Sequence, residues 1–341
     1  MTVDRRTFVK LAAAGLSSAA VALTACVEGG PLAEGSRHRP TPEQPLTPTD
    51  QWYFVALTGA YEADRRNHRL RVGGRTRREL ALTIADLKEQ FEEVTVPHTL
   101  ACVGNVPNGT LMSASIFRGV RSKDVLTAAG IKSNATSALI YGLDGYLSPR
   151  AIEDLMRPDT ILAYEMGLTE DTLEPLNIEH GFPMRILTPG IYGFVQPKWI
   201  SSITCVDDSD HIDVLRRSNG YASGVMQLAS GFSWPVDGYA TSAGPMELVG
   251  YAFGDGRVIN SVELDFGQGQ PAQADIVWNT PEDDLPPRVW AIWRYLWEAT
   301  PGQWAITVRA RYADGQTQRS GRNFPYSGGS LTTIGVNIRE S

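Results

Sequence analysis

Cysteine is scarce in this chain, whose 341 residues include three, at positions 26, 102 and 205. Three cysteines do not make a disulfide framework, and no C-x-x-C-H segment for haem attachment is present. Basic residues are also in the minority: the formal net charge is -7, which argues against nucleic acid as a partner. Beyond the first 26 residues, no hydrophobic run is long enough to span a bilayer. Any membrane attachment is therefore expected at the N-terminus alone.

The composition is that of a globular protein with more than one domain. Hydrophobic residues make up 42% of the chain and charged residues 20%, and the length leaves room for two domains of ordinary size. Changes in composition along the chain predict four parts. These are a signal (1–26), a flexible tether (27–49), a first domain (50–238) and a second domain (239–341).

The first 26 residues have the composition of an export signal. The basic stretch Asp4–Lys10 precedes an apolar run, Leu11–Ala25, and then small residues follow. The paired arginines of this stretch resemble a twin-arginine signal, and Leu23–Cys26 resembles a lipobox. We therefore expect export to the periplasmic or extracytoplasmic face, with lipidation at Cys26 as the only membrane anchor. The alternatives are a basic amphipathic helix that stays in place, and a Cys26 that is incidental to ordinary cleavage.

Cys102 lies at the end of a predicted strand. Residues 94–102 alternate, and Gly104-Asn105 then breaks the pattern into a turn. Pro97 indicates an edge strand. A thiol where a strand ends and a loop opens is in a common place for a reactive group or a ligand. The alternative is that Cys102 is a small buried hydrophobe. One side of the predicted strand comprises Val94, Val96, His98, Leu100 and Cys102.

Short strands and short helices alternate through the first domain, which indicates an α+β fold. Helices are predicted at 83–91, where Thr83 and Asp86 form a capping signal, at 122–130, capped and ended by Gly130, and at 148–158. A strand is predicted from Ala138 into a polar turn that contains Asp144 and Tyr146.

The second domain has the pattern of a β-sandwich. Residues 246–253 and 258–266 are predicted to form a hairpin, and residues 303–312 a further strand. Several short strands at this spacing suggest an immunoglobulin-like sandwich. Periodicity alone leaves helix and strand open for the tryptophan-rich segment around Trp293.

Six segments, in order along the chain, resemble the sulfite oxidase family of molybdenum enzymes. They are Leu100–Asn105 (L-x-C-x-G-N), Asp124–Gly130 (D-V-L-x-x-A-G), Leu162–Met166 (L-A-Y-E-M), His180–Arg185 (H-G-F-P-x-R), Pro189–Gly193 (P-G-x-x-G) and Lys198-Trp199 (K-W). The resemblance implies a sulfite oxidase-type molybdopterin-binding domain followed by an immunoglobulin-like dimerisation domain. It also favours a strand for the tryptophan-rich segment.

The resemblance implies a molybdenum–molybdopterin cofactor and roles for particular residues. Cys102 would be the metal ligand and Tyr146 would lie near the metal, both as catalytic residues. The pterin and its phosphate would be bound by Tyr53, Phe54, Val55, Asp144, His180, Arg185 and Lys198. Each of these side chains also has an ordinary structural explanation, as a turn residue, a loop histidine, a strand-end tyrosine or a surface charge.

The implied activity is two-electron oxygen-atom transfer between a small molecule and molybdenum. Since no haem motif is present, electrons would pass to or from a separate cytochrome or quinone-linked protein. The family's arginines are replaced by Ala56 and by Val106-Pro107, which puts sulfite in doubt beside an organic S- or N-oxide. The alternative function is a non-catalytic lipoprotein that keeps the fold as a binding module.

Overall fold

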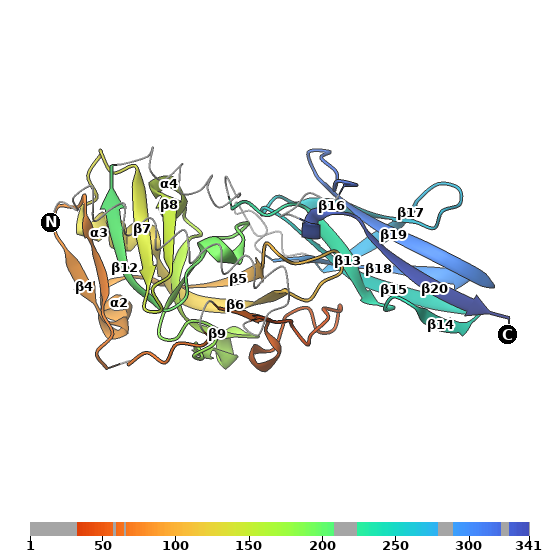
Figure 1. The fold of residues 1–341 in the computed structure, drawn as a ribbon, viewed down its shortest axis with the longest axis horizontal. Coiled ribbons are helices and arrows are strands. Elements are labelled where there is room, and N and C mark those ends of the chain that lie inside the picture. The colour runs from red at the N-terminus through yellow and green to blue at the C-terminus, as the bar shows by residue number, and fades with distance from the viewer. Residues whose placement is uncertain are drawn as a thin grey trace.

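The computed structural model describes residues 33–56, 59–64, 66–207, 224–278, 289–321 and 327–340. Figure 1 shows two bodies arranged along the long axis, the first containing β3 to β12 and the second β13 to β20. The described chain is mostly β with few helices. None of the helices in these ranges is long and apolar enough to cross a membrane. The signal and Cys26 lie outside the described residues, so export and lipidation stay predictions.

One sheet of the first body has the strand order β4-β3-β12-β7-β8. Its strands are β3 (Leu70–Gly74), β4 (Leu80–Leu82), β7 (Ser137–Gly142), β8 (Leu147–Ala151) and β12 (Ile200–Val206). The helices are α2 (Ile84–Gln90), α3 (Ser122–Ala129) and α4 (Ile152–Leu155). Leu70, Leu126, Ile140 and Ile203 belong to one buried cluster of strand and helix residues, which forms the core of this body.

A second sheet of the first body has the order β10-β9-β6-β5 and contains β5 at its edge. Its strands are β5 (Glu93–Ala101), β6 (Met112–Arg121), β9 (Ile161–Gly167), β10 (Glu174–Pro175) and β11 (Arg185–Leu187), which pairs with β9. The edge position indicated by Pro97 is thus confirmed, because a residue without an N–H is tolerated there.

The alternation predicted along β5 ends where the second body begins to cover it. Thr99, Leu100 and Ala101 are all buried in succession. The reason is that the backbone N–H of Trp290, in the second body, donates to Thr99 Oγ1 at 2.9 Å. Cys102 follows β5 directly, and its N–H donates to Leu111 O at 2.8 Å, so the hairpin pairing extends to the thiol residue.

Two predicted helices are confirmed. Thr83 and Asp86 form a capping box at the start of α2, and Gly130 ends α3 with a φ of 70°. Ser122 does not cap α3, however: it is the first helical residue, and its hydroxyl donates to Leu155 O. Its side chain therefore links α3 to α4.

The helix predicted at 148–158 is wrong over its first half. Residues 147–151 form β8, which pairs with β7 at the edge of its sheet, and only α4 remains helical. Pro149, interpreted as a first helical residue, lies opposite Leu139 on this edge strand. Proline is tolerated in an edge strand for the same reason as at a helix start, since its missing N–H has no partner to lose.

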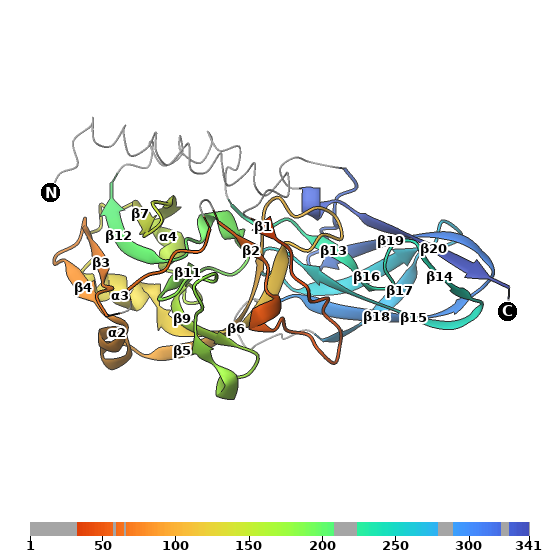
Figure 2. The ribbon, with the colours of Figure 1, turned by 60° about the horizontal axis from the view of Figure 1, so that its bottom comes forward.

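Residues 33–49, the described part of the tether predicted at 27–49, are held by backbone hydrogen bonds, and we name them the N-terminal strap; residues 27–32 lie outside the described residues. The N–H of Ser36 donates to Thr110 O and that of Thr47 to Ala114 O, both at 2.7 Å. Trp290 Nε1 of the second body donates to Pro45 O, also at 2.7 Å. The strap begins with β1 (Ala33–Glu34), which pairs with β2 (Phe54–Val55), and in Figure 2 it lies in red where the two bodies meet. Backbone pairing thus orders a segment whose composition indicated flexibility.

The second body consists of strands in two layers around one core. The strand order is β13-β15-β18-β17-β16-β19-β20-β14, and residues from both halves of this path, such as Trp293 and Val308, share one buried cluster. The immunoglobulin-like topology and the boundary at 238/239 stay predictions, and β13 pairs with β15 from before that boundary. The strands are β13 (Ala229–Trp234), β14 (Tyr239–Ser242), β15 (Gly244–Phe253), β16 (Ile259–Asp265), β17 (Ala272–Trp278), β18 (Ala291–Ala299), β19 (Gly302–Tyr312) and β20 (Thr332–Arg339).

The hairpin predicted between residues 246–253 and 258–266 is wrong in its pairing. Both segments are strands, yet β15 pairs with β13 and β18, whereas β16 pairs with β17 and β19. The short connection crosses from one layer to the other, which neighbouring residues cannot indicate. The tryptophan-rich segment is a strand, β18, as the resemblance favoured.

Candidate functional site

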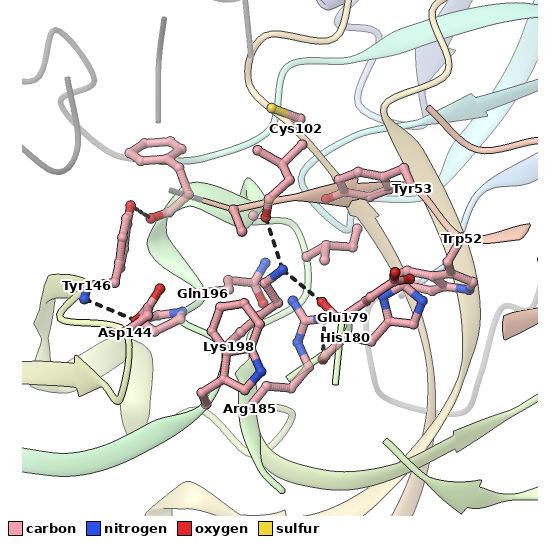
Figure 3. Close-up of a pocket in the computed structure, with 17 residues that line it drawn as sticks. Trp52, Tyr53, Cys102, Asp144, Tyr146, Glu179, His180, Arg185, Gln196 and Lys198 are labelled. Atoms are coloured by element: carbon pink, nitrogen blue, oxygen red, sulfur yellow. Dashed lines mark hydrogen bonds between the residues drawn. The ribbon is translucent and has the colours of Figure 1, made fainter. Parts of the chain in front are cut away.

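One pocket of the first body is lined by residues from loops that follow several different strands (Figure 3). Its empty volume is about 730 Å³ with the open mouth included. The thiol follows β5, the turn between β7 and β8 supplies two polar residues, and the segment between β9 and β12 supplies the basic residues. The lining consists of Trp52, Tyr53, Val55, Ala56, Leu100, Cys102, Asp144, Tyr146, Glu179, His180, Arg185, Gly193, Phe194, Gln196, Pro197, Lys198 and Trp199.

Most of the residues that the sequence put forward therefore lie in one place. Phe54 is the exception: it is absent from the lining, and its ring lies 4.2 Å from Lys198 Nζ. Figure 3 shows Cys102 at one end of the pocket and the basic side chains at the other.

The two basic side chains at this end donate hydrogen bonds to backbone carbonyls. Lys198 Nζ donates to Val55 O at 3.0 Å and to Glu179 O at 2.8 Å. Arg185 is 3% exposed and donates from Nη1 to His180 O at 3.1 Å, while its buried Nε has no hydrogen-bond partner among the described residues. Burial lowers the pKa of Arg185 to about 10, and burial together with the Arg185 charge lowers that of Lys198 well below its ordinary value.

His180 is a neutral imidazole close to both basic side chains. Burial, followed by the charges of Arg185 and Lys198, lowers its pKa to about 3. Nε2 lies 3.2 Å from Thr49 O, and a carbonyl can only accept, so Nε2 holds the proton. The ring also packs against Trp52, with centroids 5.6 Å apart. His180 is therefore an uncharged part of the pocket lining at neutral pH.

Cys102 is a buried thiol, 4% exposed, on a well-fixed turn. Leu111 N–H donates to Asn105 Oδ1 at 2.9 Å, and Asn105 N–H donates to Cys102 O at 3.1 Å. Cys205, by contrast, lies in β12 within the core, where burial raises its pKa to about 11. Neither of these two residues forms a disulfide within the described chain.

Tyr146 and Asp144 form the side of the pocket between its two ends. The Tyr146 hydroxyl donates to Phe194 O, and the Tyr146 N–H donates to Asp144 Oδ1 at 3.1 Å. Burial raises the pKa of Asp144, with the opposing hydrogen bond and the Lys198 charge as smaller effects. The turn thus places one carboxyl group and one phenol against the pocket.

Sequence reasoning missed several of the lining residues. Gln196 accepts from Thr188 N–H at 2.6 Å and so closes the loop that contains Phe194, but no sequence pattern indicated it. Trp199 was noted in a motif without a role. It has a φ of 50°, a left-handed conformation that is rare for a bulky residue, and its ring lies 4.4 Å from Lys198 Nζ. No pattern in the sequence indicated this left-handed conformation of Trp199.

The arrangement suits a cofactor with a soft metal at one end and an anion at the other. A thiolate suits a soft metal, and an unpartnered guanidinium nitrogen beside an ammonium suits a phosphate. Over the described ranges, no group of three or more His, Cys, Asp or Glu residues could hold a metal ion by itself. A metal beside Cys102 would therefore need further ligands from a cofactor.

Comparison with known proteins agrees with this chemistry. Residues 58–212 match the oxidoreductase molybdopterin binding domain. Sulfite oxidase of Rattus norvegicus is 27% identical over 67% of this chain and 47% of its own length, and that of Gallus gallus is 26% identical over 76% and 63%. A nitrate reductase [NADH] of Hordeum vulgare is 27% identical over 66% of this chain and 30% of its own. The chain thus spans about half the length of the curated relatives it matches.

A solved structure shares the fold of nearly the whole chain. The sulfane dehydrogenase SoxCD from Paracoccus pantotrophus superimposes with a TM-score of 0.72 at 20% sequence identity, over 90% of this chain and 85% of that one. The matching family model implies a molybdenum–molybdopterin cofactor, and the residues of the pocket fit it. The chain therefore contains an oxidoreductase molybdopterin binding domain over residues 58–212, and it is similar to sulfite oxidases over about two thirds of its length.

Proposed function

We propose that this chain is an exported, lipid-anchored oxidoreductase that moves an oxygen atom between a small molecule and molybdenum. The observation that supports this most strongly is the polarity of the pocket. A buried thiol lies at one end, and at the other lie two basic side chains, Arg185 and Lys198, whose hydrogen bonds within the described chain go to backbone carbonyls. A pocket built this way favours a long ligand with one soft and one anionic end.

Cys102 binds the metal as thiolate in this proposal. Arg185 and Lys198 bind the phosphate: the guanidinium, whose pKa of about 10 keeps it charged at neutral pH, supplies the positive charge, and Lys198 supplies further N–H donors. Asp144 accepts hydrogen bonds from pterin N–H groups, and Tyr53 and Val55 form the wall beside it. When bound, the cofactor supplies the two-electron redox change and the oxygen-atom transfer.

Tyr146 shapes the substrate site through the loop to which it is bonded. Its hydroxyl hydrogen is directed to Phe194 O, so the phenol faces the pocket mainly with an oxygen that accepts. The hydrogen bond also fixes the ring against the loop. Substrate specificity therefore depends on this loop as well as on Tyr146.

An uncharged oxide is the favoured substrate class. Near Cys102 the lining is apolar, with Ala56 and Leu100, and Val106 of the adjoining turn is 55% exposed. A dianion such as sulfite would need a counter-charge there, and none of the lining residues at this end supplies one. An organic S- or N-oxide needs none. Electrons would come from a separate cytochrome or quinone-linked protein, and the second body would serve as the dimerisation domain.

The first experiment measures molybdenum and pterin in protein made by a host that synthesises the cofactor. We expect about one metal per chain in the unsubstituted protein and an altered metal spectrum or lost metal in Cys102→Ser. Cys205→Ser is the matched control, since that thiol is equally buried but lies in the core, outside the pocket lining. Full loss of metal in the control would contradict the specific role of Cys102. The absence of metal from well-folded unsubstituted protein would replace the proposal with the binding-module function.

The second experiment separates the substrate classes with the loaded protein. We expect reduced enzyme to be reoxidised by an organic sulfoxide or N-oxide, and oxidised enzyme to be left unreduced by sulfite. Introducing Ala56→Arg restores a cation at the place where the family has one and should shift the preference toward sulfite. Rapid reduction of the unsubstituted enzyme by sulfite would contradict the proposed substrate class.

A further inference from the structure

The turn at the thiol end of the pocket, although it follows β5 of the first body, is in contact with the second body. Asn108 Oδ1, in the turn after Cys102, accepts the N–H of Phe232 on β13 at 2.8 Å. Gly328 approaches the same turn from the other side, because a Cβ at this glycine would lie 2.5 Å from Asn105 O. The Cys102–Gly109 turn is therefore held between two segments of the second body.

The loop that contains Phe194 is joined by backbone hydrogen bonds to the residues that lead into β13. Tyr192 N–H donates to Gly224 O at 2.8 Å, and Met226 N–H donates to Gly190 O at 2.9 Å. Phe194, which accepts the Tyr146 hydroxyl, lies in this loop. By contrast, the side chains of Arg185, Lys198 and His180 hydrogen-bond, within the described chain, to carbonyls of the first body and the strap.

Asn108 has a left-handed backbone conformation and lies where several segments meet. Its φ is 57°, in the left-handed region where asparagine is several-fold enriched among non-glycine residues. Gly231 stands beside it, and a Cβ there would lie 2.8 Å from Asn108 Oδ1. The carbonyl of Asn108 also accepts from Arg39 Nη2 of the strap at 3.0 Å. One residue thus joins the thiol turn to both the second body and the strap.

We infer that Asn108 is a positioning residue through which the second body fixes the Cys102 thiol. The inference rests on the proposed function only for the role of Cys102 as ligand. It assigns the second body a part in the site itself, beyond any part in dimerisation. Loss of the Asn108 contact should free the turn and expose the thiol, without unfolding either body.

The test measures alkylation of Cys102 by iodoacetamide in cofactor-free protein, followed by peptide mass spectrometry. Asn108→Gly removes the acceptor yet suits a positive φ, so we expect alkylation about five-fold faster, the factor that corresponds to one ordinary hydrogen bond. Asn108→Asp keeps the acceptor and should retain the original rate. Cys205 in the core reports global opening and should stay equally slow in all variants.

A second pair of variants approaches the turn from the second body. Gly328→Ala should also accelerate Cys102 alkylation, because its methyl group pushes against Asn105 O. Gly321→Ala has nothing within 4 Å of the added Cβ and should change nothing. An unchanged Cys102 rate in both Asn108→Gly and Gly328→Ala, or equal acceleration at Cys205, would overturn the inference. Since no molybdenum is needed, this outcome is independent of whether the proposed function holds.

Discussion

At the scale of single residues, the pocket holds its polar side chains by backbone carbonyls rather than by opposite charges. Arg185, Lys198, His180 and Tyr146 each direct a hydrogen to a carbonyl oxygen. A carbonyl satisfies a donor but leaves the formal charge of Arg185 and Lys198 in place. The charge of Arg185, whose pKa is about 10, thus remains available to an anionic ligand while both side chains stay fixed.

His180 makes the folded protein sensitive to acid. Its pKa is about 3 in the folded state against 6.5 ordinarily. Between these two pH values, therefore, the imidazole is protonated in the unfolded chain and neutral in the folded chain. The free energy of unfolding should therefore be unaffected above pH 6.5 and fall below it, by about 2 kcal/mol at pH 5. Urea unfolding of cofactor-free protein at pH 7 and pH 5 measures this fall.

His180→Gln isolates the contribution of the imidazole. The glutamine amide can still donate to Thr49 O but does not titrate. We expect the loss between pH 7 and pH 5 to shrink by about 2 kcal/mol in this variant. Part of the slope will remain, because burial also lowers the pKa of His38 and His68. An unchanged slope would show that His180 is protonated without penalty.

At the scale of elements, β8 is the support of the pocket loop. Tyr146, Ser148 and Arg150 alternate along the chain, so they share one face, and all three donate to the segment 188–195. Arg150 is 2% exposed and reaches Val195 O at 3.0 Å while pairing with Asp154 at 3.2 Å. The buried guanidinium of Arg150 thus holds the loop 188–195 against β8.

Arg150→Met should destabilise the fold markedly. It removes the donors of two loop oxygens and leaves Asp154 without its partner, which costs about 3 kcal/mol. Arg75→Met breaks the exposed pair with Asp207 and should cost less than about 1 kcal/mol. Chemical denaturation of the two variants measures the difference, and equal losses would mean that Arg150 has no special part in the loop.

Elements with local signals could be predicted from the sequence. The capping box of α2 and the glycine end of α3 depend on residues a few positions apart, and both are present. β8 was misread because Ser148-Pro149 satisfies helix-start chemistry and edge-strand chemistry equally well. The pairing of β15 and the order of the strap depend on residues far along the chain, which no local pattern contains.

The site shows the same limit. Motif order brought Cys102, Asp144, His180, Arg185 and Lys198 to attention, and the fold places all of them around one pocket. The left-handed Trp199 and the attachment of the Cys102 turn to the second body were not foreseen. A backbone conformation and a contact between distant segments are properties of the packed chain rather than of a motif.

At the scale of the whole molecule, Gly190 joins the two bodies. It has a φ of 76°, and a Cβ there would lie 2.1 Å from Asp255 O of the second body. Gly238, with a φ of 79°, has nothing within 4 Å of the same added atom. The two glycines thus share a backbone requirement and differ only in the contact between bodies.

Gly190→Ala should therefore cost more than Gly238→Ala. The shared backbone strain is about 1 kcal/mol, and the clash adds about 2 kcal/mol more. Thermal unfolding of both variants measures the difference. We further expect Gly190→Ala to speed alkylation of Cys102, since this contact belongs to the same boundary. Equal destabilisation by the two alanines would show that the bodies separate there without cost.

The strap has a consequence for the order of events in synthesis. Trp52 of the pocket wall donates to Thr47 O of the strap, and the strap is held in turn by Trp290, which follows Pro45 by 245 residues. A ribosome releases Trp290 long after Pro45, and contacts so distant in sequence form late and slowly. The wall beside the cofactor is thus completed only when both bodies have been made. Insertion of the cofactor is therefore a late step, performed on a finished chain.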